Sequence, residues 1–243
     1  MNYIELNGVS SRDVQGLIIQ SLAPITKPKM RTSIEEIDGR DGDIVTRLGY
    51  SAYDKEISIG LSWDYDIDEV IQYFVDNDKG TVLFSNEEDK LYKYEILDQI
   101  DFERLVRFRT ANVKFHVQPF KHSSIETVKT WYKDGGSSTG TTNSIIVRNN
   151  GNYLSRPTIT IHGNGEIYIS LNGSLILAIN LGENAQITID GEQMEAYNKD
   201  TSALMNRYVS GNYENIKLKV GKNVISWTGN VTSFEVSNFS RWI

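Results

Sequence analysis

The sequence predicts a mainly β protein with an N-terminal β-rich domain (residues 1–122) and a C-terminal antiparallel β-sandwich (residues 123–243). Apolar and polar residues alternate in many short stretches, which is typical of strands with one buried face. In the second half these stretches are separated by Gly, Asn and Asp turns at intervals of roughly ten residues. Charge supports the division: residues 1–122 hold 15 Lys+Arg and 22 Asp+Glu, whereas residues 123–243 hold ten of each.

Composition limits the classes of function. The chain of 243 residues is 39% hydrophobic, enough for packed cores, and contains no cysteine, which excludes disulfides, thiol catalysis and Cys-based zinc sites. The N-terminus shows no secretory signal, and the longest purely apolar run is about five residues, far too short to span a membrane. We therefore expect a soluble protein made in a cytoplasm, with no membrane partner. The net charge of −7 argues against a duplex nucleic-acid binder.

The stretch from Ile34 to Trp63 predicts a long projecting hairpin or loop. Its turn holds Gly39 and Gly42 three residues apart among charged side chains, a spacing that allows a sharp reversal. It ends on a strand in which every second residue is apolar: Ile57, Ile59, Leu61 and Trp63. Residues 43–51 mix apolar and polar side chains, which suits either an arm that docks on a neighbouring subunit or an ordinary exposed hairpin tip.

One helix is expected at residues 66–77. Its apolar residues have the spacing of a single helical face: Ile67, Val70, Ile71, Phe74 and Val75. Asp66 can cap the first turn together with Glu69, and Gly80 is expected to end the helix. Asp64, Asp66 and Asp68 also match the opening of a calcium-binding EF-hand loop, but that loop needs glycine where Glu69 stands and glutamate where Val75 stands. Helix capping therefore explains these carboxylates better.

Strands are expected on both sides of the boundary at His122, including 81–84, 91–97, 113–117 and 123–132. The cluster Arg104–Arg109 interleaves cations with apolar residues. It fits an edge strand guarded by charge or a salt-bridging subunit surface better than a nucleic-acid site, because its domain is acidic. The Gly/Ser/Thr run at 134–143 lacks the lysine of a phosphate-binding loop and is expected to be a flexible hairpin tip.

Eight short strands are expected in the second half: 145–147, 158–161, 167–171, 175–181, 187–189, 216–220, 224–227 and 234–236. The turns between them include Gly163-Asn164-Gly165, Asn172-Gly173 and Gly229-Asn230. No helical periodicity competes with this pattern, so an antiparallel sandwich is predicted.

The sequence contains no motif that indicates an enzyme. His116, His122 and His162 lack the spacing of a helical metal site, no dinucleotide or nucleophile-elbow motif is present, and no carboxylate pair is singled out. No catalytic residue, cofactor or metal is therefore expected. The serious alternative is a carbohydrate-binding adhesin that stacks sugars of the host cell wall on exposed aromatic residues. The candidates are Trp131, Tyr132, Tyr153, Tyr168, Tyr197, Tyr208, Tyr213, Trp227 and Trp242, of which Trp227 fits a core position better.

Several motifs resemble the distal tail protein (Dit) family of long-tailed phages that infect Gram-positive hosts. They are Leu6-Asn7-Gly8, the Ile37–Asp43 turn, the strand–helix–strand order up to Pro119-Phe120, Asn149–Tyr153, Pro157–Ile159, Ile189–Gly191, Gly221–Asn223 and Arg241-Trp242-Ile243. Together they span nearly the whole chain. The resemblance implies a ring-forming N-terminal domain and a galectin-like C-terminal domain.

The resemblance also implies a function: a non-enzymatic virion protein at the tip of a siphophage tail. Its ring, expected to be a hexamer, would join the tail tube protein to the tail-associated tip protein and could carry a receptor-binding protein. DNA would pass through the channel without specific binding, and the acidic first half could line that channel. Residues expected at the subunit interface are Gly39, Arg40, Asp41, Gly42, Arg47 and Tyr50.

Overall fold

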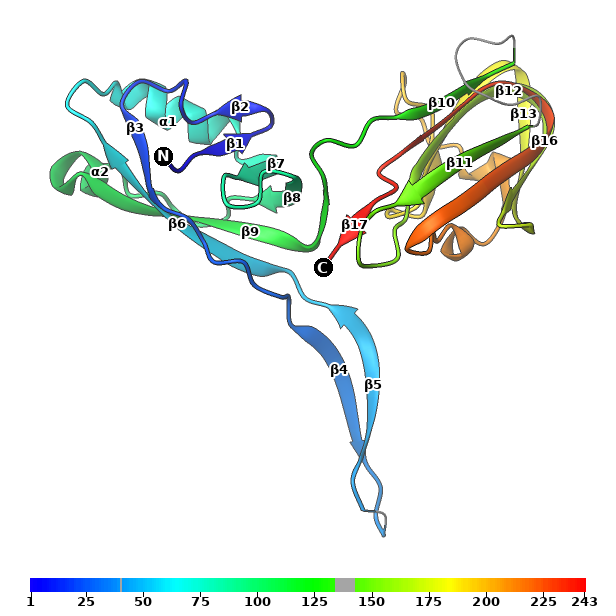
Figure 1. Ribbon diagram of the computed structural model, residues 1–243, viewed down its shortest axis with the longest axis horizontal. Coiled ribbons are helices and arrows are strands. Elements are labelled where there is room, and N and C mark those ends of the chain that lie inside the picture. The colour runs from blue at the N-terminus through cyan, green and yellow to red at the C-terminus, as the bar shows by residue number, and fades with distance from the viewer. Residues whose placement is uncertain (40, 134–142) are drawn as a thin grey trace. The chain divides into compact units, whose positions relative to one another are not determined.

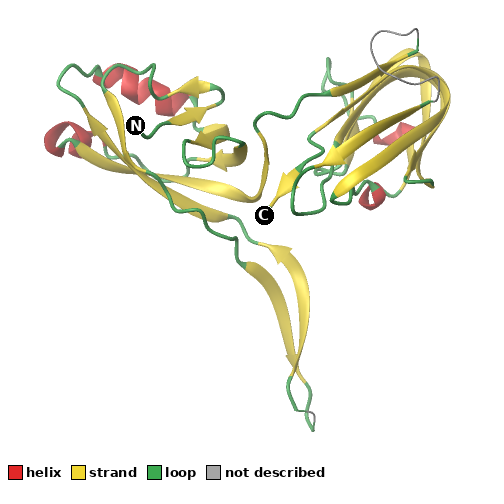
Figure 2. Cartoon of the chain, in the orientation of Figure 1, coloured by secondary structure: helices red, strands yellow, loops and turns green. Residues whose placement is uncertain are grey.

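The computed structural model describes residues 1–39, 41–133 and 143–243. It divides into two compact units: unit 1 contains residues 1–124 and Ile243, and unit 2 contains residues 125–242. Figure 1 labels their elements in chain order. The division predicted after His122 lies two residues before this one. Strands dominate both units (Figure 2), which confirms the mainly β fold class.

Unit 1 is built on one antiparallel sheet with the strand order β2-β1-β7-β8-β9-β6-β3. A separate two-stranded hairpin, β4-β5, interrupts the chain between β3 and β6. The strands are β1 (Ile4–Leu6), β2 (Val9–Ser10), β3 (Leu17–Ser21), β4 (Met30–Glu36), β5 (Asp43–Tyr50), β6 (Tyr53–Leu61), β7 (Lys79–Phe84), β8 (Lys90–Glu95) and β9 (Thr110–Ser123).

The core of unit 1 follows the alternation read from the sequence. Ile57, Ile59 and Leu61 of β6 are buried, as period two requires of a strand with one covered face. The same alternation predicts a buried Trp63, and this is wrong: β6 ends at Leu61, and Trp63 is 94% exposed. Because the strand ends at Leu61, the alternation of buried and exposed side chains no longer applies at Trp63.

Helix α1 (Ile67–Asp76) confirms the expected helix and its cap. The side chain of Asp66 accepts hydrogen bonds from the backbone N–H groups of Asp68 and Glu69. Glu69 does not complete the reciprocal cap, because its carboxylate accepts instead from the backbone N–H of Gln15 at 3.2 Å. Gly80 does not end the helix either. The C-cap is Asn77, and Gly80 lies within β7.

The basic cluster is a second helix. Residues Phe102–Phe108 form α2, with Leu105 buried and Asp101 capping the N-terminus. Of the two alternatives for Arg104–Arg109, the edge strand is therefore wrong and the subunit surface stays a prediction. The described residues of unit 1 form two helices where one was expected. Only Leu105 of α2 is fully buried, so the helix shows too little apolar periodicity to be recognised from sequence alone.

Unit 2 is an antiparallel β-sandwich whose long strands pass through both layers. The first half of β16 pairs with β11 and its second half with β10, while β12 pairs along most of β16 and β13. The strands are β10 (Lys129–Tyr132), β11 (Ser144–Asn149), β12 (Thr158–Leu171), β13 (Ser174–Asp190), β14 (Glu195–Tyr197), β15 (Val209–Gly211), β16 (Gly221–Ser237) and β17 (Arg241–Trp242). Two short 3₁₀ helices, η1 (Asn206–Tyr208) and η2 (Tyr213–Asn215), lie between β14 and β16.

Three predicted strand pairs are single long strands. Ranges 158–161 and 167–171 join in β12, 175–181 and 187–189 in β13, and 224–227 and 234–236 in β16. The glycine signals between them mark bulges rather than chain reversals: β12 and β16 shift register near Gly163 and Asn164. A Cβ on Gly163 would lie 2.4 Å from the carbonyl oxygen of Asn230, so glycine allows the two bent strands to approach closely.

Two further strand predictions need correction. Residues 216–220 contain only an isolated bridge from Leu218 to Ser155, and the strand expected at 123–132 begins at Lys129. The hairpin tip expected at 134–143 falls almost entirely outside the described residues. Trp227 is buried, as expected, and stacks on Phe234 with ring centroids 4.1 Å apart.

Candidate subunit interface

The hairpin β4-β5 is the clearest surface feature of unit 1. Its seven- and eight-residue strands pair antiparallel from Met30–Tyr50 at the base to Glu36–Asp43 near the tip. At about 3.3 Å per residue, the arm is roughly 25 Å long. Figure 1 shows it leaving the rest of unit 1 at the start of β6. The structure therefore contains the projecting hairpin that the sequence predicts.

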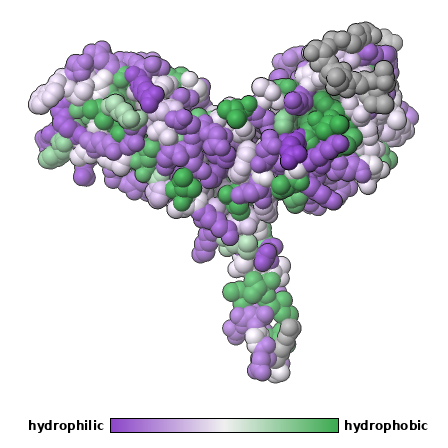
Figure 3. Space-filling model, viewed as in Figure 1, coloured by the Kyte–Doolittle hydropathy of each residue, from purple (hydrophilic) through white to green (hydrophobic). Residues whose placement is uncertain are grey.

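Apolar side chains on this hairpin have no core to cover them. Ile34 and Val45 are cross-strand partners and are 59% and 56% exposed. Ile37 near the turn and Leu48 are also exposed. Figure 3 shows hydrophobic side chains gathered on the arm. A two-stranded hairpin is marginally stable by itself in water, and exposed apolar patches mark sites of association.

The outer half of the hairpin is acidic. Residues 33–46 contain Glu35, Glu36, Asp38, Asp41 and Asp43 against a single arginine. Glu36 and Asp43 are direct cross-strand partners, and like charges placed opposite each other destabilise a strand pair. A cationic surface brought against this face would relieve their repulsion.

Contacts at its base fix the hairpin to the sheet. Lys55 at the start of β6 donates from Nζ to the carbonyl oxygen of Pro24 at 2.8 Å, and Asn86 donates to Ala23 at 3.1 Å. The backbone N–H of Ser51 donates to Lys29 at 2.9 Å. These bonds tie both chain connections of the arm, so its direction is set by unit 1.

Lys55 belongs to a polar cluster within an otherwise apolar setting. Lys121 pairs with Glu87 at 2.8 Å, and the hydroxyl of Tyr92 donates to the same carboxylate. Burial lowers the pKa of Lys55 to about 8, against the opposing effect of Glu87, and raises the pKa of Tyr92. Lys55 was not among the residues predicted from sequence, although it occupies the same strand phase as Ile57, Ile59 and Leu61.

The six residues predicted at the interface divide between tip and base. Gly39 and Gly42 adopt left-handed backbone angles, with φ of 81° and 80°, as their spacing suggested. Asp41 and Arg47 are exposed on the arm, and Arg40 lies outside the described residues. Tyr50 packs edge-to-face on Phe120 with ring centroids 5.9 Å apart, so its ring anchors the base of the arm. Their role at an interface stays a prediction.

Other kinds of site receive little support in the part of the chain that the structure describes. There, no group of three or more His, Asp or Glu side chains is arranged to hold a metal ion, and no helix has the length and hydropathy to cross a membrane. Among the histidines, His116 contacts Asp54 at 2.8 Å.

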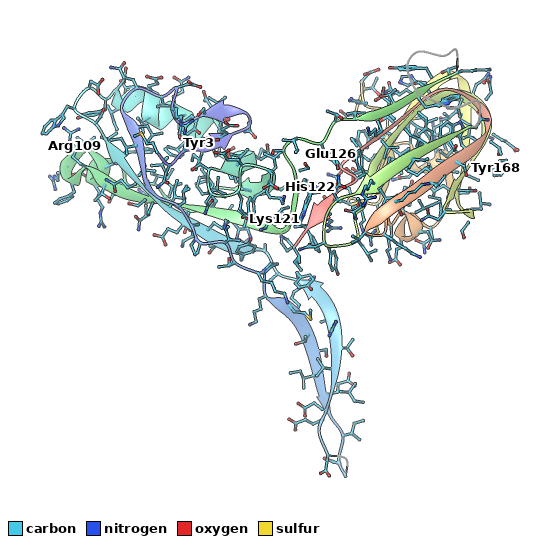
Figure 4. All side chains as sticks on the ribbon, in the orientation of Figure 1. Tyr3, Arg109, Lys121, His122, Glu126 and Tyr168 are labelled. Atoms are coloured by element: carbon cyan, nitrogen blue, oxygen red, sulfur yellow. The ribbon has the colours of Figure 1, made fainter. Side chains whose placement is uncertain are left out.

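Of the nine aromatic residues proposed for sugar binding, two are buried, two are exposed and five are half-buried. Trp131 and Trp227 are buried and pack together in the sandwich core, whereas Tyr132 and Tyr168 are 49% and 41% exposed. Tyr132 lies opposite Ser233 of β16, and Tyr168 opposite Thr228. Tyr168 (Figure 4) donates its hydroxyl proton to Glu166 at 2.9 Å. These two exposed rings occupy different positions along β16, so they do not form a shared platform for a sugar.

Comparison with known proteins gives matches in structure alone. No family model matches the sequence, and no curated protein matches it. The Dit protein (gp 19.1) of phage SPP1, described as a paradigm of the hub adsorption apparatus of phages infecting Gram-positive hosts, matches with a TM-score of 0.62 and 16% identity over 100% of both chains.

Two baseplate structures of phage p2 in its activated conformation match as well. The strontium form has a TM-score of 0.56 and 10% identity, and covers 98% of each chain. The calcium form has a TM-score of 0.57 and 8% identity, and covers 100% of this chain and 98% of that one. Since the likeness covers both units, this chain has the fold of the SPP1 Dit protein, and the resemblance seen in its motifs is confirmed at the level of fold.

Proposed function

We propose that this chain is a distal tail protein: a structural virion component that forms a ring at the tip of a siphophage tail. The observation that carries the proposal is the fold of the SPP1 hub protein, which matches along the whole chain. The exposed hairpin supports it, because an arm with uncovered apolar side chains is suited to holding the next copy of the chain.

The ring would be a hexamer formed by the N-terminal units. Copies in such a ring make heterologous contacts, in which one surface of each copy meets a different surface of the next and rotation closes the circle. The hairpin supplies one of these two surfaces. Gly39, Asp41, Gly42 and Arg47 would lie in the contact, and Tyr50 would hold the arm in position.

The partners of the proposed ring follow from its place in a tail. One face would bind the tail tube protein and the other the tail-associated tip protein, with a receptor-binding protein as a further partner. DNA would pass through the channel without specific binding. The excess of seven negative charges in residues 1–122 supports this, since acidic walls repel phosphate. We infer no catalytic activity for the ring.

Light scattering coupled to size exclusion tests the proposal across a wide range of protein concentration. We expect a species with about six times the 27.6 kDa mass of the chain, and closed rings in negative-stain micrographs of that fraction. A monomer at every concentration, both alone and in the presence of the tail tube protein, would contradict it.

A further inference from the structure

A second surface of unit 1, around helix α2, exposes aromatic rings together with arginine side chains. We call it the α2 patch and define it as Trp63, Arg104, Arg107, Phe108 and Arg109. Trp63 is 94% exposed and Phe108 67% exposed. Figure 4 labels Arg109 beside α2. Tryptophan and arginine are the residues most enriched among the side chains that dominate binding energy at protein interfaces.

The side chain of Arg109 lies beside two aromatic rings at the patch. The guanidinium of Arg109 lies 4.5 Å from the ring centroid of Tyr65 and 5.5 Å from that of Trp63, and it donates to the carbonyl oxygen of Ser62 at 3.1 Å. Arg109 also has a left-handed backbone (φ 56°) as the C-cap of α2. These contacts restrain Arg109, so this side chain loses less conformational entropy when a partner binds.

The patch keeps a positive charge, because the nearby carboxylates of Asp101 and Glu103 have partners other than the guanidinium groups of Arg104 and Arg109. Asp101 caps α2 by accepting from the backbone N–H of Arg104 at 2.8 Å, and Glu103 pairs with Arg107 at 3.3 Å. No carboxylate among the described residues pairs with the guanidinium of Arg104 or of Arg109. A hollow of about 480 Å³ lies here, lined by Asp101, Glu103, Arg104, Arg107 and Phe108.

The hairpin is the chemical complement of this patch. Its outer half presents the exposed pair Ile34 and Val45, followed by the mutually repelling carboxylates of Glu36 and Asp43. Each surface has an apolar part next to a charged part, and the charges have opposite sign. Opposite charges across an interface set its register and exclude wrong partners.

The two surfaces cannot meet within one chain. The hairpin joins β6 at Tyr53, whereas Trp63 follows the far end of the same strand at Leu61. Nine strand residues separate these ends by about 30 Å, and the arm points away from α2 (Figure 1). Two different surfaces at opposite ends of one strand can join separate copies of the chain head to tail.

We propose that the hairpin of one copy docks on the α2 patch of the next, with Ile34 and Val45 against Trp63 and Phe108, and Glu36 and Asp43 facing Arg104. This inference rests on the proposed ring and deepens it by naming the receiving surface. Docking would cover a tryptophan of roughly 200 Å² and bring cations to the repelling carboxylates of the arm.

Charge exchange in the full-length chain gives the first test. We expect Arg104→Glu to raise the concentration needed for ring assembly at least tenfold, and the added pair Glu36→Lys and Asp43→Lys to restore assembly. Arg148→Glu, the same charge change on an exposed residue of β11, is the matched control and should assemble normally. Equal loss with both arginine variants, or no restoration by the lysines, would overturn the proposal.

Cross-linking tests the contact between the hairpin and the α2 patch independently of ring formation. Val106 lies on α2 beside the patch and is exposed. Because the chain has no cysteine, Val45→Cys and Val106→Cys proteins can be mixed and treated with a short bis-maleimide, with Leu175→Cys in unit 2 as the control partner. We expect a cross-linked dimer only in the Val45→Cys and Val106→Cys mixture.

Three other outcomes are decisive. A ring seen by light scattering without this cross-link would overturn the docking surface and leave the ring standing. Cross-linked chains without a closed ring would support the contact and contradict the ring. Neither ring nor cross-link would overturn both.

Discussion

At the scale of single residues, Lys55 shows how unit 1 accommodates a charge beside its core. Its side chain is almost fully buried, and its Nζ lies 5.4 Å from the ring centroid of Phe84 and 5.0 Å from that of Tyr92. Removing an ammonium group from water is costly. The bond from Lys55 to Pro24 offsets part of this cost and secures the connection that leads into the hairpin.

The lowered pKa of Lys55 predicts a pH-dependent contribution to stability. Its pKa falls from 10.5 in the unfolded chain to about 8 in the folded protein. Between these values the unfolded chain binds more protons, so the folded state gains stability as pH rises. Relative to Lys55→Met, the wild-type chain should gain on the order of 1 kcal/mol between pH 7.5 and 9.5, after allowance for solvent screening.

Urea unfolding of both proteins at several pH values measures this difference. Tyrosines whose pKa values are raised by burial are present in both proteins, so their effect cancels in the comparison. Lys79→Met, at an exposed position of β7, should show no such change relative to the wild type. A constant difference between wild type and Lys55→Met across the pH range would contradict the prediction.

At the scale of elements, helix α1 depends on a side-chain cap, and the strands of the sandwich depend on glycines at bulges. The two features can be tested separately. Asp66 satisfies two backbone N–H groups at the start of α1, and glycines let β12 and β16 bend together. The cap can be recognised in sequence, because Asp is a favoured residue at a helix start. The bulge glycines look like turn glycines in sequence, and only the structure shows that they lie within strands.

Loss of the α1 cap should weaken unit 1. Asp66→Ala removes the acceptor for Asp68 and Glu69 and should lower the free energy of unfolding by about 1 kcal/mol. Asp66→Asn keeps a side-chain oxygen at the same place and should recover most of this loss. Chemical denaturation compares the variants, and equal destabilisation by Ala and Asn would show that the cap bond is not the cause.

Substitution of Gly229 tests whether the close approach of β16 to β12 requires a residue without a side chain. The φ of Gly229 is 104°, and an added Cβ would lie 2.2 Å from the carbonyl oxygen of Glu166. Gly229→Ala should therefore cost roughly 3 kcal/mol, whereas Gly173→Ala should cost about 1 kcal/mol, because Gly173 has a left-handed backbone and open space around it. Thermal unfolding measures both, and equal losses would remove crowding as the explanation.

At the scale of the whole molecule, the hairpin lies apart from both hydrophobic cores. The cores of unit 1 and unit 2 are made by other elements, so the arm adds little to the stability of the single chain. In the proposed ring, the next copy of the chain would cover the apolar side chains of the arm.

Replacing Ile34 and Val45 with Ser therefore separates assembly from folding. We expect the thermal midpoint of the monomer to stay within about 2 °C of the wild type, because exposed surface substitutions change stability little. The assembled species should be lost in light scattering. As a control, Leu175→Ser and Val220→Ser replace exposed apolar residues outside the hairpin and should leave assembly intact.

Local patterns determined much of this protein from sequence alone. The alternation of β6, the cap of α1, the Gly39 and Gly42 turn and the β-sandwich were all readable, because each depends on neighbours within a few residues. The motifs also indicated the Dit resemblance, which the structural matches confirm at the level of fold.

Only the tertiary structure decided the rest. Long-range pairing makes each of the three predicted strand pairs a single bent strand. The sequence could not reveal this, since bulge and turn glycines look alike in it. It also leaves Trp63 exposed beyond the end of β6 and makes the Arg104 cluster a helix that rests on Leu105. Which surface an apolar residue faces depends on what the folded chain brings against it, and no local pattern contains that information.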